Sequence, residues 1–114
     1  MTSLDPQVLD QIVEQIVKVL DPEKIILFGS YARGEAGPNS DVDMLVVADV
    51  ADPNGFRSVE ARMAIGSVPF GLDLVVVTPD EWDTWRGFVN TVMGQASKYG
   101  KALYERERSA IVAG

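Results

Sequence analysis

The chain has 114 residues, of which 46% are hydrophobic, and its 17 acidic against 10 basic side chains give a net charge of −7. It contains no cysteine and no histidine, which excludes disulfides, thiolate zinc sites, a Ser-His-Asp triad and imidazole metal ligation. The length predicts one domain, 1–114, with no span for a membrane. The acidic balance argues against direct nucleic-acid binding, and the lack of a secretory signal predicts a cytoplasmic protein.

The first half of the chain predicts a helix followed by two strands. The helix is expected over Pro6–Leu20, with apolar residues at helical spacing and Asp5 as its N-cap. A short β-branched run predicts a strand over Lys24–Phe28, and a brief helix is expected to begin at Ser30. A second apolar strand is expected over Val42–Val47.

The second half predicts two helices and two strands. After a loop, Asp52-Pro53 suits the start of a helix with one face formed by Phe56, Val59 and Met63, which could extend to Ser67. Gly66 and Pro69 mark its end. The strongest strand is expected over Phe70–Val77. A capping box at Thr78–Glu81 then starts a helix whose apolar face comprises Trp82, Trp85, Val89, Val92, Met93 and Ala96. Lys101–Tyr104 is a candidate last strand, and Arg106 and Arg108 belong to a charged, frayed tail. This alternation predicts a small α/β domain with helices packed on a central sheet.

Two carboxylates at the start of the second strand suggest a metal site. Asp41 and Asp43 are two residues apart, so on a strand their side chains leave the same face. Carboxylates held this close repel one another unless a cation lies between them, and an all-oxygen site favours Mg²⁺ or Mn²⁺. The alternative is a pair of acidic residues in an ordinary turn.

A third aspartate lies within an otherwise apolar strand. Asp73 is flanked by Leu72 and Leu74, and an ionised carboxylate buried there would require a partner. A position at a sheet edge facing water, or an arginine partner, is the alternative. A third ligand beside Asp41 and Asp43 explains Asp73 better.

The turn after the first strand suits a phosphate group. Gly29 allows close approach of the backbone, and a helix that starts at Ser30 would offer free N–H groups. Arg33, one helical turn on, is placed to meet another phosphate oxygen. The alternative is an ordinary strand-to-helix turn.

Together these residues resemble a known family. Gly29-Ser30, ten residues, then Asp41-Val42-Asp43 is similar to the signature of the polymerase-β-like nucleotidyltransferases. The string from Gly29 to Gly34, followed by Ser40-Asp41-Val42-Asp43, resembles the minimal nucleotidyltransferase branch, which includes MntA-type antitoxins. Leu72-Asp73-Leu74-Val75 resembles the strand of the third carboxylate. The resemblance implies a small mixed sheet with packed helices, a catalytic core over about 24–79, and a C-terminal helix and tail over 79–114.

The resemblance also implies roles for individual residues. Asp41 and Asp43 would bind Mg²⁺ or Mn²⁺, and Asp73 would complete the metal site and help to deprotonate the attacking hydroxyl. Gly29 and Ser30 would hold the terminal phosphates of ATP. Arg33 and Ser40 would support them.

The implied reaction is attack on the α-phosphate with loss of pyrophosphate. Relatives of this size are commonly antitoxins of type VII toxin–antitoxin systems, which transfer AMP from ATP to a tyrosine of a HEPN ribonuclease toxin. We therefore expect a HEPN-type partner, with which the chain could form a hetero-oligomer. Two alternatives stay open: a non-catalytic antitoxin that neutralises its partner by binding, with Phe88 and the tail around Tyr104 as candidate contacts, and a nucleotidyltransferase for a small molecule such as an aminoglycoside.

Overall fold

The computed structural model describes residues 5–37, 40–51 and 55–106, which form helices and strands in the order α1, β1, β2, α2, β3, α3, α4, β4. Their bounds are α1 Pro6–Leu20, β1 Lys24–Phe28, β2 Val42–Val47, α2 Phe56–Ile65, β3 Leu72–Val77, α3 Pro79–Trp85, α4 Val92–Tyr99 and β4 Lys101–Glu105. The predicted bounds of α1, β1 and β2 are thus confirmed. Asp5 caps α1, with its carboxylate accepting a hydrogen bond from the Gln7 N–H.

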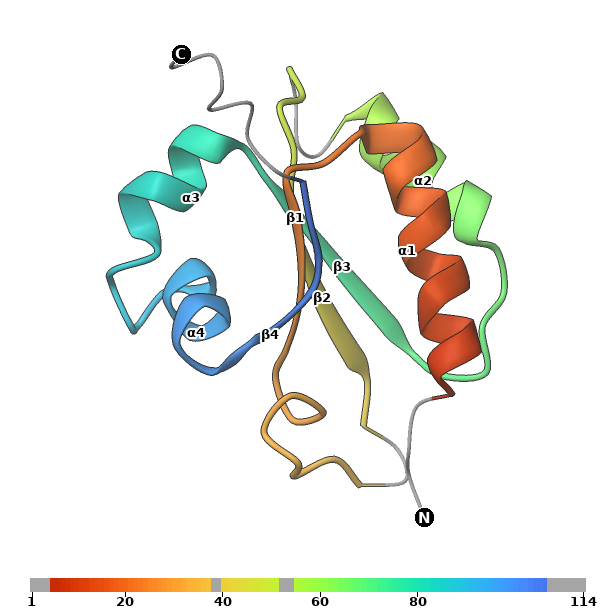
Figure 1. Ribbon diagram of the computed structural model, residues 1–114, viewed down its shortest axis with the longest axis horizontal. Helices are drawn as coiled ribbons and strands as arrows, with labels where there is room; N and C mark the ends of the chain where they lie inside the picture. The colour runs from red at the N-terminus through yellow and green to blue at the C-terminus, as the bar shows by residue number, and fades with distance from the viewer. Residues whose placement is uncertain (1–4, 38–39, 52–54, 107–114) are drawn as a thin grey trace.

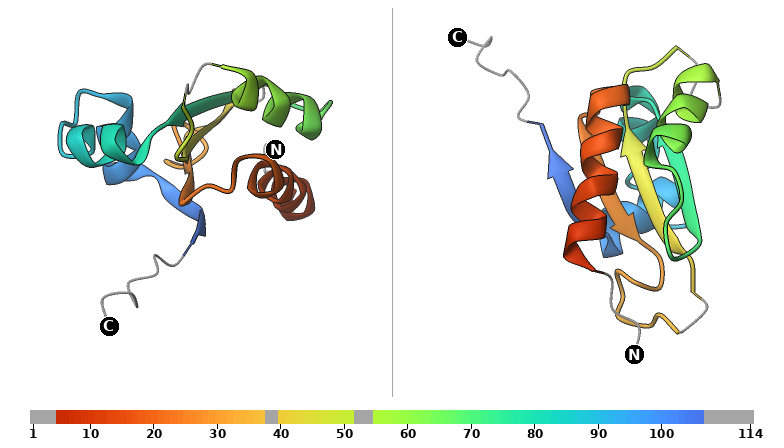
Figure 2. Two further views of the ribbon diagram at one scale, coloured as in Figure 1. Left: turned by 90° about the horizontal axis from the view of Figure 1, so that it is seen from above. Right: turned by 90° about the vertical axis from the view of Figure 1, so that its right-hand side faces the viewer.

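The strands form a mixed sheet in the order β3-β2-β1-β4. β1 is antiparallel to both β2 and β4, whereas β2 and β3 run parallel because α2 connects them. Helices α1 and α2 lie on one side of the sheet and α3 and α4 on the other (Figure 1), and the view from above shows the same layers (Figure 2). The expected class, a small mixed sheet with helices packed on it, is confirmed.

The core lies on both faces of β2. Met44 and Val46 pack with α1 in one cluster, whereas Leu45 and Val47 pack with Trp82 of α3 in the other. These four side chains of β2 are fully buried, as expected of a strand covered by helices on both faces. This burial holds β2 rigidly, and with it the carboxylate at its start.

Helix α2 turns its large apolar residues outward, contrary to the expectation of a core face. Phe56, Val59 and Met63 are 80%, 50% and 77% exposed, while the small residues Ser58 and Ala61 are buried. Small side chains allow α2 to lie close against α1, and the larger residues face away. Asp52-Pro53, the expected start, lies outside the described residues; α2 begins at Phe56 after Gly55.

The single helix expected after β3 is two helices. The capping box is confirmed: the Thr78 Oγ1 accepts from the Glu81 N–H at 3.1 Å, and the Glu81 carboxylate accepts from the Thr78 N–H at 2.9 Å. The chain leaves α3 before Gly87, and Thr91 caps α4 by accepting from the Gly94 N–H at 3.0 Å. Of the expected apolar face, Trp82, Met93 and Ala96 pack on the sheet, whereas Trp85, Val89 and Val92 are exposed.

The last strand and the residue after it are fastened to the sheet. β4 extends to Glu105, one residue beyond the expectation, and the Arg106 N–H donates to the Glu23 carbonyl at 2.8 Å. The Arg106 guanidinium pairs with Asp21 at 2.9 Å, so Arg106 is not part of a frayed tail. Arg108 lies outside the described residues. Among those described, no helix has the length and apolar character needed to cross a membrane.

Candidate active site

The sheet register brings the predicted carboxylates to one end of the sheet. Asp43 lies opposite Phe28 of β1 and opposite Asp73 of β3. Neighbouring residues of adjacent strands project from the same face, so Asp43 and Asp73 stand side by side. Asp41 precedes β2 directly, two residues before Asp43. The turn that follows β1 lies at this same end of the sheet (Figure 1).

The three carboxylates differ in exposure. Asp43 is half-buried, whereas Asp41 and Asp73 are exposed. Asp73 is not buried within an apolar strand: β3 is an edge strand of the described sheet and this side chain faces water, which was the alternative. Burial therefore does not demand a partner for Asp73. Its position beside Asp43 is what makes it a candidate site residue.

Asp43 has the perturbed ionisation of the group. Burial raises the pKa of its carboxyl above the ordinary value of 3.8. The negative charges of Asp73 and Asp41 raise this pKa further, whereas the Arg33 guanidinium lowers it. Burial and two like charges therefore disfavour the ionised form of Asp43. A bound cation would offset both effects.

Two glycines make room for two of the carboxylates. A Cβ on Gly29 would lie 2.2 Å from the Asp43 Oδ2, and a Cβ on Gly71 would lie 2.1 Å from the Asp41 Oδ1. Gly29 also has φ +77°, a conformation that favours glycine. Sequence reasoning assigned no role to Gly71. Its signal was a lone glycine among apolar strand residues, a pattern that indicates close approach.

The donor set fits a hard divalent cation in its chemistry. It consists of carboxylate oxygens on adjacent strands, the ligands that Mg²⁺ and Mn²⁺ prefer. In residues 5–37, 40–51 and 55–106, however, no three acidic side chains converge closely enough to enclose a metal ion. Asp41 lies against Gly71, just before β3, while Asp43 lies against Gly29, just after β1.

The brief helix expected to begin at Ser30 is not formed. Residues Ser30–Gly34 form hydrogen-bonded turns rather than a helix, so no helix dipole is directed at the site. The bonds in this segment use the N–H groups of Arg33, Gly34 and Glu35. Within the described residues, the N–H groups of Ser30, Tyr31 and Ala32 donate no hydrogen bond, and backbone N–H groups in such turns suit an anion.

Arg33 and Ser40 have local partners in the structure. The Arg33 Nε donates to the Glu35 Oε1 at 2.9 Å, and its influence on the pKa of Asp43 places its charge near the carboxylates. The Ser40 Oγ accepts from the Gly37 N–H at 2.8 Å, which braces the loop before Asp41. The Ser40 hydroxyl hydrogen is still able to donate to a ligand.

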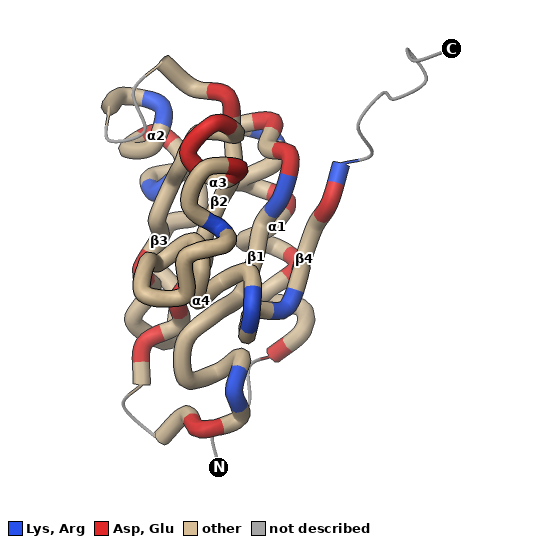
Figure 3. Tube along the Cα trace, turned by 90° about the vertical axis from the view of Figure 1, so that its left-hand side faces the viewer, with Lys and Arg blue, Asp and Glu red and all other residues tan. Residues whose placement is uncertain are grey.

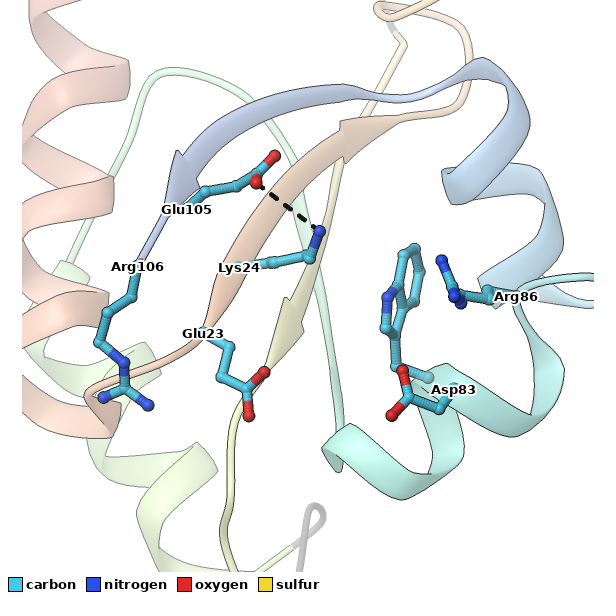
Figure 4. Close-up of a pocket in the computed structure, with 7 residues that line it drawn as sticks. Glu23, Lys24, Asp83, Arg86, Glu105 and Arg106 are labelled. Carbon is cyan, nitrogen blue, oxygen red and sulfur yellow. Dashed lines mark ion pairs between the residues drawn. The ribbon is translucent and has the colours of Figure 1, made fainter. Parts of the chain in front are cut away.

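A pocket of about 380 Å³ lies at the opposite end of the sheet (Figure 4). It is lined by Glu23, Lys24, Trp82, Asp83, Arg86, Glu105 and Arg106. Lys24 and Glu105, at the start of β1 and the end of β4, pair at 3.7 Å. Acidic and basic residues are interspersed over the elements (Figure 3). None of the predicted site residues lines this pocket.

Comparison with known proteins assigns the chain to a family. A model of the nucleotidyltransferase domain matches residues 9–108, so the chain belongs to the nucleotidyltransferase domain family. A candidate protein adenylyltransferase of Methanocaldococcus jannaschii is 64% identical over 28 residues, which is 25% of this chain and 28% of that protein. The match thus spans little more than a quarter of that relative.

Three solved structures share the fold. A candidate nucleotidyltransferase from Sulfolobus solfataricus is 25% identical with a TM-score of 0.56, over 90% of this chain and 81% of that one. A toxin–antitoxin crystallised with AMP-PNP is 24% identical with a TM-score of 0.60, over 90% and 77%. A mutant of the toxin–antitoxin MntA-HpeT is 22% identical with a TM-score of 0.58, over 96% and 80%. The expected nucleotidyltransferase fold is therefore confirmed.

Proposed function

We propose that the chain transfers AMP from ATP to a tyrosine of a cognate HEPN ribonuclease toxin, and so acts in the cytoplasm as the antitoxin of a type VII system. The observation that carries the nucleotidyl-transfer site is the in-register pair Asp43–Asp73, with Asp41 just before it and the Gly29–Ser30 turn at the same sheet end. The choice of a protein acceptor is supported by the adenylyltransferase name of the archaeal relative and by the toxin–antitoxin structures with the same fold.

Each site residue has a part in the proposed reaction. The tyrosine oxygen attacks the α-phosphorus of ATP, and the bond from that phosphorus to the bridging oxygen of the β-phosphate breaks, so that pyrophosphate leaves with the electron pair. The Asp73 carboxylate, exposed at the sheet edge, accepts the tyrosine proton. The N–H groups of the turn after Gly29 and the Ser30 hydroxyl hold the terminal phosphates, supported by Arg33 and Ser40.

Asp41 and Asp43, with Asp73 beside them, would hold the divalent cation, Mg²⁺ or Mn²⁺. The cation would neutralise phosphate charge and stabilise the leaving oxygen. The raised pKa of Asp43 supports this assignment, because a cation relieves the repulsion that raises it. Positioning and charge are most of what phosphoryl transfer needs from a protein.

The test is a transfer assay with the cognate toxin. We expect incubation of the chain with α-labelled ATP, Mg²⁺ and the product of the neighbouring toxin gene to label the toxin. Asp41→Asn and Asp43→Asn should each reduce labelling by at least about a hundredfold, because each removes a carboxylate from the site. Asp10→Asn, an exposed aspartate of α1, is the matched control and should leave labelling unchanged. Absence of label on the toxin with the unaltered chain would contradict the proposal.

A second candidate function is neutralisation by binding alone. It is favoured by an exposed apolar patch at the α3–α4 connection, where Phe88 is 58% exposed and contacts Trp85 with ring centroids 5.5 Å apart. Tyr104, the other candidate contact, is half-buried. A binding antitoxin would keep its protection against the toxin in Asp41→Asn and Asp43→Asn, whereas an enzyme would lose it. Growth of cells that express the toxin distinguishes the two.

A further inference from the structure

We infer that Gly71 is a positioning residue for Asp41: the space left by its missing side chain holds the Asp41 carboxylate next to Asp73. This inference rests on the proposed function, in which Asp41 and Asp73 share a divalent cation. Gly71 lies in the short segment before β3, outside the motif that identified the site.

The strand register places Gly71 directly beside Asp41. Val42 pairs with Leu72 and Asp43 with Asp73, so continuing the parallel ladder by one residue sets Asp41 opposite Gly71. The Val42 N–H donates to the Gly71 carbonyl at 2.8 Å, which fixes this alignment. Residues two apart on a strand face the same side. Positions 41 and 43 therefore lie beside positions 71 and 73 of the neighbouring segment. Three of these four positions are aspartates, and the fourth is Gly71.

The space over Gly71 is filled by the Asp41 carboxylate. A Cβ built on Gly71 would lie 2.1 Å from the Asp41 Oδ1 and 2.9 Å from its Cγ, far inside any real contact. Gly71 is absent from the described glycines with positive φ, so its backbone conformation is open to any residue. Glycine is required here for space rather than for a dihedral angle.

A side chain at position 71 would therefore act through Asp41. The atoms that it meets are the far end of an exposed side chain, which can rotate away without disturbing the sheet. Rotation away from Gly71 moves the Asp41 carboxylate away from β3, the strand that carries Asp73. The fold would survive, while the three carboxylates would be less able to share one ion.

The first experiment measures Mn²⁺ affinity in the full chain, without nucleotide, by electron paramagnetic resonance of free Mn²⁺. We expect Gly71→Ala to weaken binding about tenfold, the lower end of what support of a ligand is worth. Gly87→Ala is the matched control, because a Cβ there has nothing within 4 Å and needs no unusual φ. Its Mn²⁺ affinity should equal that of the unaltered chain.

The second experiment tests the contact without metal or activity. The change in melting temperature caused by Gly71→Ala is measured in EDTA, both in the unaltered chain and in Asp41→Ala. The methyl group of Gly71→Ala displaces a carboxylate only where Asp41 is present. Gly71→Ala should therefore lower the melting temperature more in the unaltered chain than in Asp41→Ala. A merely structural glycine would give the same shift in both.

The outcomes separate this inference from the proposed function. Equal Mn²⁺ affinity in Gly71→Ala and the unaltered chain would overturn the inference alone, as would equal shifts in the two backgrounds. Failure of the unaltered chain to bind Mn²⁺ would overturn the proposed metal site, and the melting-temperature cycle would still decide whether Gly71 seats Asp41.

Discussion

At the scale of single residues, the ionised Asp43 carboxylate destabilises the folded protein. Burial and two like charges raise its pKa, so the folded chain binds this proton more strongly than the unfolded chain does. Stability then falls as pH rises from the ordinary pKa of 3.8 through the higher folded value. The cost is absent at lower pH, where both states are protonated, and is fully present at neutral pH.

We therefore expect Asp43→Asn to stabilise the metal-free protein at pH 7. The gain should be no more than about 1 kcal/mol, because Asp43 is half exposed and solvent screens its charge. Urea unfolding in EDTA at pH 7 and at pH 3 measures the effect, which should vanish at pH 3. Asp10→Asn should change neither value. A loss of stability at both pH values would show that Asp43 stabilises the fold.

For single residues, the sequence could predict the candidate carboxylates but not their contacts or their exposure. The alternation of strand side chains was enough to place Asp41 and Asp43 together, and the position of a carboxylate within an apolar strand singled out Asp73, in agreement with the family resemblance. The contact between Asp41 and Gly71 depends on which strands are neighbours and on their register, and sequence periodicity contains neither. The exposure of Asp73 stayed an alternative for the same reason, because an edge strand and a central strand can have the same apolar sequence.

At the scale of elements, α1, β1 and β2 were predictable because caps, prolines and apolar spacing agree in each. Helix α2 was not, since its apolar residues follow helical spacing but face outward. Periodicity shows that a helix has two faces, and the choice of buried face depends on packing. Here the small face contacts α1. The predicted helix after β3 is too long because the chain ends α3 before Gly87 and Thr91 caps a new helix, α4.

The orientation of α2 leads to a test by substitution. We expect Phe56→Ala to change the free energy of unfolding by no more than about 0.5 kcal/mol, as is usual for an exposed side chain. Ile16→Ala, in the core face of α1, should cost about 2–5 kcal/mol because it empties a fully buried position. Urea unfolding of both variants gives the comparison. A loss above about 2 kcal/mol for Phe56→Ala would mean that Phe56 is part of the core.

At the scale of the whole molecule, the carboxylates and the pocket lie at opposite ends of the sheet. Asp43 and Asp73 lie where β2 and β3 begin, whereas the pocket of Figure 4 lies where these strands end. The family model spans most of the chain, and the α/β class followed from the sequence. Strand order did not follow, because the β2–β3 pairing bridges α2 and depends on long-range contacts.

That parallel pairing also has a consequence for the order of events in folding. Asp43 and Asp73 are separated by the whole of α2, so they meet only after a long loop has closed, and such contacts tend to form late. A cation bound between these strands would then stabilise the native state but not the transition state. We expect saturating Mn²⁺ to slow unfolding while leaving the folding rate unchanged in stopped-flow urea experiments. Faster folding in Mn²⁺ would instead show that the two strands pair before the rate-limiting step.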